Sequence, residues 1–217
     1  MKQRENSSGF SLIELLVVIA IIGVLAAILV PAIGSARINS QRALASSNLR
    51  QLAVATSLYA SENNNSYPRM RPSTGEGGKW EGPFWPDLLA RYLDQDADQS
   101  TNREGSVFHC PLEENHHPTL ADYGCNPYII QSQGNLPDVR VNRVLEPAKK
   151  VLFVTAREHH LNRGGWFVDR NFVSNPNANS SPSDRGTGLV VLVYADGRVA
   201  TMGLEEVNSR ALELFAL

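Results

Sequence analysis

One carboxylate stands alone in a long apolar run. Between Phe10 and Ala36, Glu14 is the only ionisable side chain. A charged residue inside an apolar span costs on the order of 3 kcal/mol on insertion scales, and such residues are functional by default. A cut between Gly9 and Phe10 would leave an ammonium group one helical turn before Glu14, and we expect that amine to neutralise the carboxylate. The alternative is a Glu14 that merely reaches water from the membrane edge.

A second group combines thiols and imidazoles. His109, Cys110, His116, His117 and Cys125 lie within a short segment. They allow a disulfide between the two cysteines, two free thiols, or a metal site, although their spacing matches no standard zinc pattern. We favour the disulfide, which would close a loop of about 15 residues and contribute on the order of 3 kcal/mol. We expect no metal and no cofactor.

Residues that would indicate an enzyme are missing from the sequence. It has no Gly-x-Ser-x-Gly elbow, no Cys–His pair in a recognisable frame, and no phosphate-binding glycine loop followed by a helix. The pair His159-His160 follows a predicted strand, where histidines are more often exposed loop residues than ligands. We therefore expect a protein that is not an enzyme.

The element that must position Glu14 is a helix over residues 10–62. Pro31, with Gly34 close by, should bend it, because proline costs about 3 kcal/mol inside a helix. Beyond the bend, apolar residues recur every three or four positions and predict one buried face. These residues are Ala45, Leu49, Leu52, Thr56 and Tyr59. Arg37, Gln41, Arg42, Asn48, Arg50 and Gln51 fall on the other faces, and three asparagines at 63–65 should end the helix.

The first half of this helix is long enough to cross a membrane. At about 1.5 Å per residue, residues 10–33 span roughly 36 Å, more than a hydrocarbon core of about 30 Å. Lys2 and Arg4 precede the run, and that basic end should stay cytoplasmic. A cleaved secretory signal fits less well, because its apolar run would be shorter and would end in a small-x-small site.

Composition limits the other possibilities. The chain has 217 residues and a net charge of -2, which suits one helix plus one globular domain and gives no reason to expect nucleic acid as a partner. On the far side of the membrane both cysteines would meet an oxidising compartment.

The remaining sequence predicts an α+β domain with an antiparallel sheet. Residues 84–93 read as a short helix with Pro86 in its first turn. Strands are expected at 151–155, 165–168, 188–194 and 198–202, and a last short helix at about 204–214. Asp196-Gly197 between two apolar runs predicts a hairpin with a type I′ turn.

The segment from Gly9 to Val18 resembles the class III signal of type IV prepilins and type II secretion pseudopilins. That resemblance implies cleavage after Gly9 by a prepilin peptidase and methylation of the new N-terminal Phe10. It also implies that Glu14, at the fifth mature position, is the assembly residue, and that Pro31 is the helix-breaking proline of such proteins. The resemblance covers about the first thirty residues.

The second half resembles the pilin-like proteins with an "H-x9-DG" C-terminal region. Phe108-x-Cys110-Pro111, Tyr123-Gly124-x-Asn126 and the closing hairpin carry that likeness. The chain departs from it at Gly186 and Arg198, where histidines are frequent. Some pseudopilins hold calcium in a C-terminal loop, but we interpret the polar stretch here as a flexible surface loop rather than a calcium site. Its residues are Asn171, Asn175, Asn177, Asn179, Ser180, Ser183 and Asp184.

Together these features predict a pilin-like subunit with a leader at 1–9, a transmembrane assembly helix at 10–36, a periplasmic helix half at 37–63 and a soluble α+β domain at 64–217. The resemblance implies three kinds of partner: the peptidase, other pilin-like subunits, and an inner-membrane assembly platform. It implies a bacterial inner-membrane protein with a cytoplasmic N-terminus and a periplasmic domain. The alternative function is a periplasmic binding domain or enzyme that uses the helix only as a tether.

Overall fold

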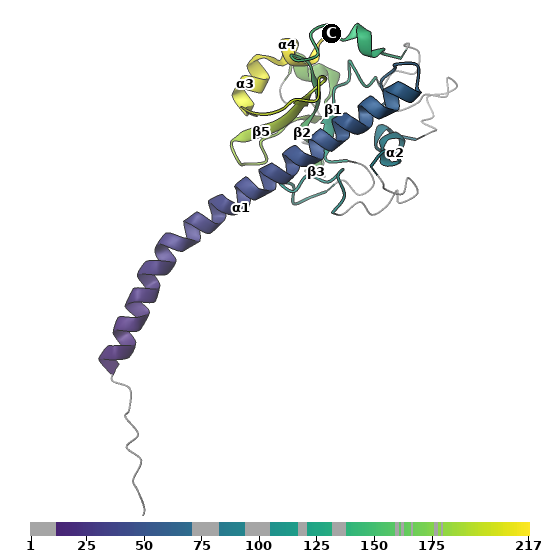
Figure 1. Ribbon diagram of the computed structural model, residues 1–217. Helices are drawn as coiled ribbons and strands as arrows, with labels where there is room; N and C mark the ends of the chain where they lie inside the picture. The colour runs from purple at the N-terminus through teal and green to yellow at the C-terminus, as the bar shows by residue number, and fades with distance from the viewer. Residues whose placement is uncertain are drawn as a thin grey trace, which may run out of the picture. The chain divides into compact units, whose positions relative to one another are not determined.

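The computed structural model describes residues 12–70, 83–93, 105–116, 121–131, 138–158, 161, 163–165, 167–175, 178 and 180–217 (Figure 1). The chain divides into two compact units, residues 1–40 and residues 41–217. The predicted leader and the Gly9–Phe10 junction lie outside the described residues.

The first unit contains the start of helix α1, Leu12–Glu62. The helix continues through Pro31, which lacks the N–H needed for one intrahelical bond. Ser35 Oγ donates a hydrogen bond of 3.2 Å to the Pro31 carbonyl oxygen. The predicted extent of the helix is therefore confirmed over the described residues, whereas the bend at Pro31 stays a prediction.

In the second unit, the end of α1 buries the predicted face. Ala45, Leu49 and Leu52 are fully buried and Thr56 nearly so, which confirms the three-and-four periodicity. Asn48 was predicted on an outward face, and that was wrong. It is buried and donates to the His109 carbonyl oxygen (3.2 Å), because the buried face is wide enough to include it.

The asparagines after α1 turn the chain as predicted. Asn64 and Asn65 adopt positive φ angles of 52° and 55°, in the left-handed region that asparagine tolerates better than most residues. A shorter helix, α2, follows at Trp85–Ala90. Pro86 lies in its first turn as predicted, and Asp87 Oδ2 accepts a 3.0 Å hydrogen bond from the Phe84 amide.

Four strands form the main antiparallel sheet, in the order β1-β2-β5-β6 (Figure 1). They are β1 Tyr123–Cys125, β2 Val151–Glu158, β5 Leu189–Tyr194 and β6 Val199–Gly203. Two short strands, β3 Arg163–Gly164 and β4 Ser180–Pro182, pair with the end of β2. This arrangement confirms the predicted α+β class with a helix packed on an antiparallel sheet.

Strand β5 shows how the sheet is covered on both faces. Val191 and Val193 belong to a core that includes α1 and α2, whereas Val190, Leu192 and Tyr194 belong to the core on the opposite face. A strand buried on both faces is apolar throughout, which explains the continuous run in the sequence. The Trp85 and Phe153 rings contact each other in the first core in a tilted arrangement, with ring centroids 4.8 Å apart.

Two C-terminal helices close the opposite core. They are α3 Leu204–Ser209 and α4 Ala211–Phe215, where one helix was predicted. The two helices join at Arg210, whose backbone (φ -104°, ψ 15°) is not helical. Phe215 meets Phe172 edge to face, 5.5 Å between centroids, and Phe172 comes from the 3-10 helix η2 Arg170–Val173. A second 3-10 turn, η1, covers Val141–Arg143.

The hairpin at Asp196-Gly197 exists, but the predicted type I′ turn was wrong. The Gly197 amide donates to the Tyr194 carbonyl and the Tyr194 amide to the Arg198 carbonyl, both at 2.9 Å, so the loop has three residues. Gly197 has a φ of 87°, whereas Asp196 is not in the left-handed region. One extra loop residue, Ala195, makes this a type I turn followed by a left-handed glycine.

Two other predictions in this half were wrong. No strand covers 165–168 among the described residues; Phe167 makes only an isolated parallel bridge to Cys125 of β1. The polar stretch at 169–184 is not simply a surface loop. Ser180 and Ser181 are buried in β4, and Ser180 Oγ donates to the Phe167 carbonyl oxygen at 2.6 Å.

Candidate functional site

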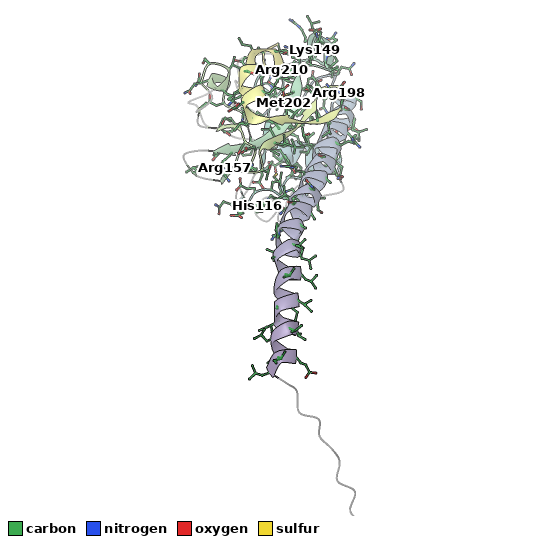
Figure 2. The ribbon with its side chains drawn as sticks, turned by 90° about the vertical axis from the view of Figure 1, so that its left-hand side faces the viewer. His116, Lys149, Arg157, Arg198, Met202 and Arg210 are labelled. Carbon is green, nitrogen blue, oxygen red and sulfur yellow. The ribbon has the colours of Figure 1, made fainter. Side chains whose placement is uncertain are left out.

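The N-terminal part of α1 exposes its apolar side chains on every side. Residues 12–40 are all exposed, and the large apolar side chains among them include Leu16, Ile22 and Val30, each more than half exposed. Figure 2 shows side chains extending outward along this part of the helix. Among the described residues, α1 is the one helix long and apolar enough to cross a membrane. Such a surface is far larger than the apolar patches of soluble monomers.

Glu14 lies in the first turn of α1, on an exposed position. A carboxylate there is favoured by the partial positive charge of the helix N-terminus, by about 0.3–1 kcal/mol. The helix therefore places the carboxylate at the end where the sequence predicts a new amine. Phe10 itself lies outside the described residues, so the Glu14–amine pairing stays a prediction.

The two cysteines do not form the predicted disulfide. Cys110 and Cys125 are both free and fully buried. Cys125 ends strand β1 opposite Phe153, and Cys110 lies in the loop before β1, where its amide donates to Asp122 Oδ2 at 3.2 Å. Burial raises the pKa of both thiols, that of Cys125 strongly, so both stay protonated and unreactive at neutral pH.

The imidazoles do gather, but around a residue that the sequence did not single out. His109, His116 and Asp122 approach one another so that their ligand atoms all lie within 4.8 Å. His116 Nδ1 is 2.5 Å from Asp122 Oδ2, and the two imidazole rings stack with centroids 4.6 Å apart. His117 and the pair His159-His160 lie outside the described residues.

A buried ion network supports this cluster. The Glu113 carboxylate pairs with Arg185, and Arg157 Nη2 approaches its Oε1 at 3.3 Å. Arg185 Nη2 also donates to the main-chain oxygens of Asp122 (3.0 Å) and Ala156. Burial lowers the pKa of Arg185 to about 10, which still leaves it charged at neutral pH. The network ties the histidine-bearing loop to strand β2.

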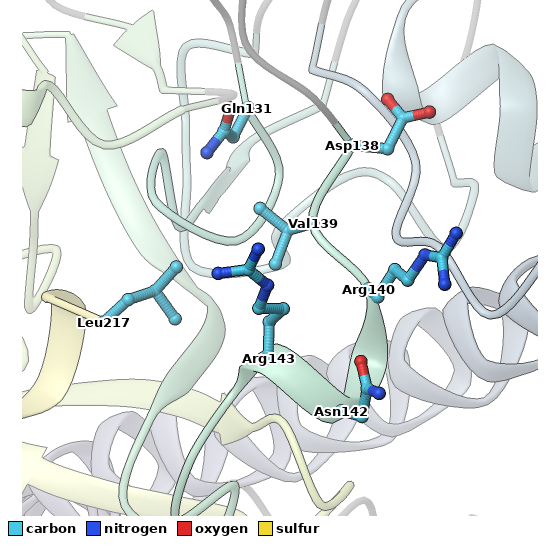
Figure 3. Close-up of a pocket in the computed structure, with 7 residues that line it drawn as sticks. All are labelled: Gln131, Asp138, Val139, Arg140, Asn142, Arg143 and Leu217. Atoms are coloured by element: carbon cyan, nitrogen blue, oxygen red, sulfur yellow. The ribbon is translucent and has the colours of Figure 1, made fainter.

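A pocket lies elsewhere in the second unit. It measures about 540 Å³ and is bordered by Gln131, Asp138, Val139, Arg140, Asn142, Arg143 and Leu217 (Figure 3). Figure 3 shows the Arg143 and Leu217 side chains facing each other across it. The described residues of its wall include no serine, cysteine or histidine, so they offer no nucleophile with a base beside it.

A family model described as the prokaryotic N-terminal methylation motif matches residues 4–30. That segment contains the predicted cleavage site, Glu14 and most of the exposed apolar part of α1. No solved structure gives a significant match to the chain.

Three curated proteins are similar to this chain. Type II secretion system core protein G of Escherichia coli is 29% identical over 136 residues, which cover 62% of this chain and 78% of that protein. The Pseudomonas aeruginosa protein of the same name is 38% identical over 61 residues, and the type IV wide pilus major component PilA4 of Thermus thermophilus is 40% identical over 60 residues. Each of these covers 28% of this chain, and 43% and 46% of the respective relative. The chain thus carries a methylation motif and is similar in part to a type II secretion system core protein and to a type IV pilus component.

Proposed function

We propose that this chain is a structural subunit of a pilin-like fibre, either a type II secretion pseudopilus or a type IV pilus, and not an enzyme. One observation carries the proposal. A methylation motif at residues 4–30 leads directly into a helix whose apolar side chains are exposed, with Glu14 in its first turn. Two of the relatives are named as a secretion-system core protein and a pilus major component, which supports the proposal.

Assembly follows from the chemistry at the helix start. A prepilin peptidase cuts between Gly9 and Phe10 and methylates the new amine. Subunits then leave the bilayer and stack through their apolar helices, where the Glu14 carboxylate neutralises the Phe10 amine of a neighbour. An unpaired charge in such a water-poor bundle costs about 3–5 kcal/mol, so the addition of each subunit is favoured only when the carboxylate and the amine form a pair.

Before assembly the subunit is anchored in the inner membrane by α1. The apolar helix and the similarity to secretion-system proteins fit this anchoring. We place the N-terminus in the cytoplasm, because Lys2 and Arg4 precede the span, and the domain of residues 41–217 in the periplasm. The peptidase and an inner-membrane assembly platform are its partners.

A tethered periplasmic binding domain or enzyme is the alternative, and Glu14 distinguishes the two. A plain tether gains nothing from a carboxylate that costs on the order of 3 kcal/mol within the span. In a fibre subunit the same carboxylate is needed at every step of growth. The alternative therefore leaves Glu14 without a role.

The test compares Glu14→Ala and Glu14→Gln with the wild-type chain in cells that contain a prepilin peptidase. We expect both variants to be processed to a chain that begins at N-methylated Phe10 and to remain in the membrane fraction, but to be missing from sheared fibres. The control is Glu62→Gln, which removes an exposed carboxylate from the other end of α1 and should leave fibres unchanged. Intact mass spectrometry and immunoblots of the two fractions give the readout.

Two results would contradict the proposal. Normal fibre yield from Glu14→Ala would show that the carboxylate has no part in assembly and would favour the tether. A wild-type chain that keeps Met1, or is cut within residues 20–36, would rule out processing at Gly9–Phe10.

A further inference from the structure

We propose that His109, His116 and Asp122 bind one divalent transition-metal ion, with Zn²⁺ as the probe. The site lies wholly within residues 41–217 and does not depend on the proposed function. Two imidazoles and one carboxylate form a three-residue ligand set that suits zinc and its neighbours in the first transition row. Calcium and magnesium prefer oxygen ligands alone, so they fit these residues poorly.

The distances allow coordination after a small adjustment. The three ligand atoms lie within 4.8 Å of one another, whereas tetrahedral bonds of about 2.0–2.2 Å bring ligand atoms to roughly 3.3–3.6 Å. His116 can make the adjustment, since its side chain is 32% exposed and extends at the surface of the domain (Figure 2). The other two ligands are buried and need to move little.

Asp122 is held in place by the loop that carries His109. The Asp122 amide donates to the Phe108 carbonyl oxygen at 2.9 Å, and the Cys110 amide donates to Asp122 Oδ2 at 3.2 Å. The carboxyl group is fully buried beside His116. A buried carboxylate is stable only with charged or hydrogen-bonding neighbours. A divalent cation would stabilise its negative charge more strongly than an imidazole does.

His109 is positioned through its backbone. Its carbonyl oxygen accepts hydrogen bonds from Asn48 Nδ2 (3.2 Å) and from the Tyr123 hydroxyl (3.4 Å). These donors come from α1 and β1, so the ligand is fixed to two elements of regular structure.

The loop before His116 is shaped by Glu113. Its Oε1 accepts the amides of Glu114 (3.0 Å) and Asn115 (3.1 Å), while Arg157 and Arg185 bind the same carboxylate. This buried anchor sets the path of the chain toward His116. It leaves the imidazole itself at the rim, where a small rotation can bring it to a metal.

Solvent can reach the site from a neighbouring cavity. A cavity of about 200 Å³ is bordered by Asn48, Ser106, His109, Cys110 and His116, among others. A water molecule needs far less space than this, so the fourth position of a tetrahedral ion can be filled by water.

The competing explanation is a simple ion pair between protonated His116 and Asp122, with the second imidazole only stacked on it. The two explanations differ in what removal of His116 does. If the two residues form only an ion pair, replacing His116 changes the stability of the domain alone. If they bind a metal, replacing His116 also causes the loss of the bound ion.

The experiment uses the full chain in detergent, stripped with a chelator that is then removed. Equilibrium dialysis against ZnCl₂ should give one zinc per chain with a Kd of about 10 µM or tighter. His116→Gln should weaken binding by more than about 100-fold, beyond the loss typical of an outer partner. His160→Gln, which removes another histidine of the same chain, is the matched control and should bind as wild type.

A second probe, Co²⁺, tests the wild-type site directly and so does not depend on whether a variant folds. Co²⁺ bound to the wild type should give visible absorption bands of a four-coordinate site, and zinc should displace it. Circular dichroism checks that His116→Gln keeps its fold. The proposal is overturned by a wild type that binds no zinc at 100 µM, roughly ten times the expected Kd. It is equally overturned by a folded His116→Gln that binds normally, or by a loss of binding in His160→Gln.

Discussion

Replacing Leu52 by alanine tests whether the second half of α1 is part of the core of the soluble domain. Leu52 is fully buried in the cluster that joins α1 to α2 and the sheet. Truncating a buried leucine to alanine costs about 3–5 kcal/mol, because transfer energy is lost and a cavity remains. In a unit of this size each kcal/mol lowers the Tm by about 2–4 °C, so Leu52→Ala should lower it by about 6–20 °C.

The matched control is Val54→Ala on the same helix. Val54 is 55% exposed, so its truncation should change stability by less than about 0.5 kcal/mol. Leu52→Met, which nearly conserves volume, should cost less than about 1.5 kcal/mol. Thermal unfolding of the three variants and wild type, followed by circular dichroism in detergent, ranks them. If Leu52→Ala has the same Tm as Val54→Ala, the buried face of α1 does not pack on the domain as the structure shows.

Two further predictions concern the sheet. Gly124→Ala should destabilise the domain by about 1–3 kcal/mol, because the new Cβ would lie 2.6 Å from the Ala156 Cβ. Gly203→Ala has nothing within 4 Å of its new Cβ, so in the same urea titration it should cost less, about 1 kcal/mol at most from the weaker N-cap of α3. The raised pKa of the Cys125 thiol means that folding favours the protonated form, so its contribution is complete below the ordinary value of 9.0 and is lost as pH rises above it. The free energy of unfolding should therefore fall more steeply above pH 9 in wild type than in Cys125→Ala. Equal pH dependence in the two proteins would contradict a raised pKa of the Cys125 thiol.

Local pattern was enough to predict the long helix and its buried face. The spacing of Ala45, Leu49 and Leu52 is a property of one helix, and burial follows once that helix has a domain to pack on. The apolar run of β5 and the Asp-Gly loop predicted a hairpin for the same reason, since both strands and their turn lie within the fifteen residues from Leu189 to Gly203. The turn type was wrong because one residue more or less in the loop changes which positions need a left-handed backbone.

The short strands β1 and β4 could not be predicted in this way. Each has three residues, and each exists because β2 supplies its hydrogen-bonding partners from a distant part of the chain. Ser180 and Ser181 look like loop residues in the sequence, yet they are buried because β2 and the Phe167 carbonyl satisfy their polar groups.

The sequence by itself determined that an apolar helix with one carboxylate precedes a helix-backed domain, because composition and periodicity are local properties. Only the tertiary structure decided which reactive side chains meet. Both cysteines are buried as free thiols, whereas His116 lies against Asp122, six positions along the chain. The order of residues brings five candidate side chains into one segment. The directions of those that the structure describes depend on β1, on the Glu113 carboxylate and on Arg185, which make contacts between distant parts of the chain.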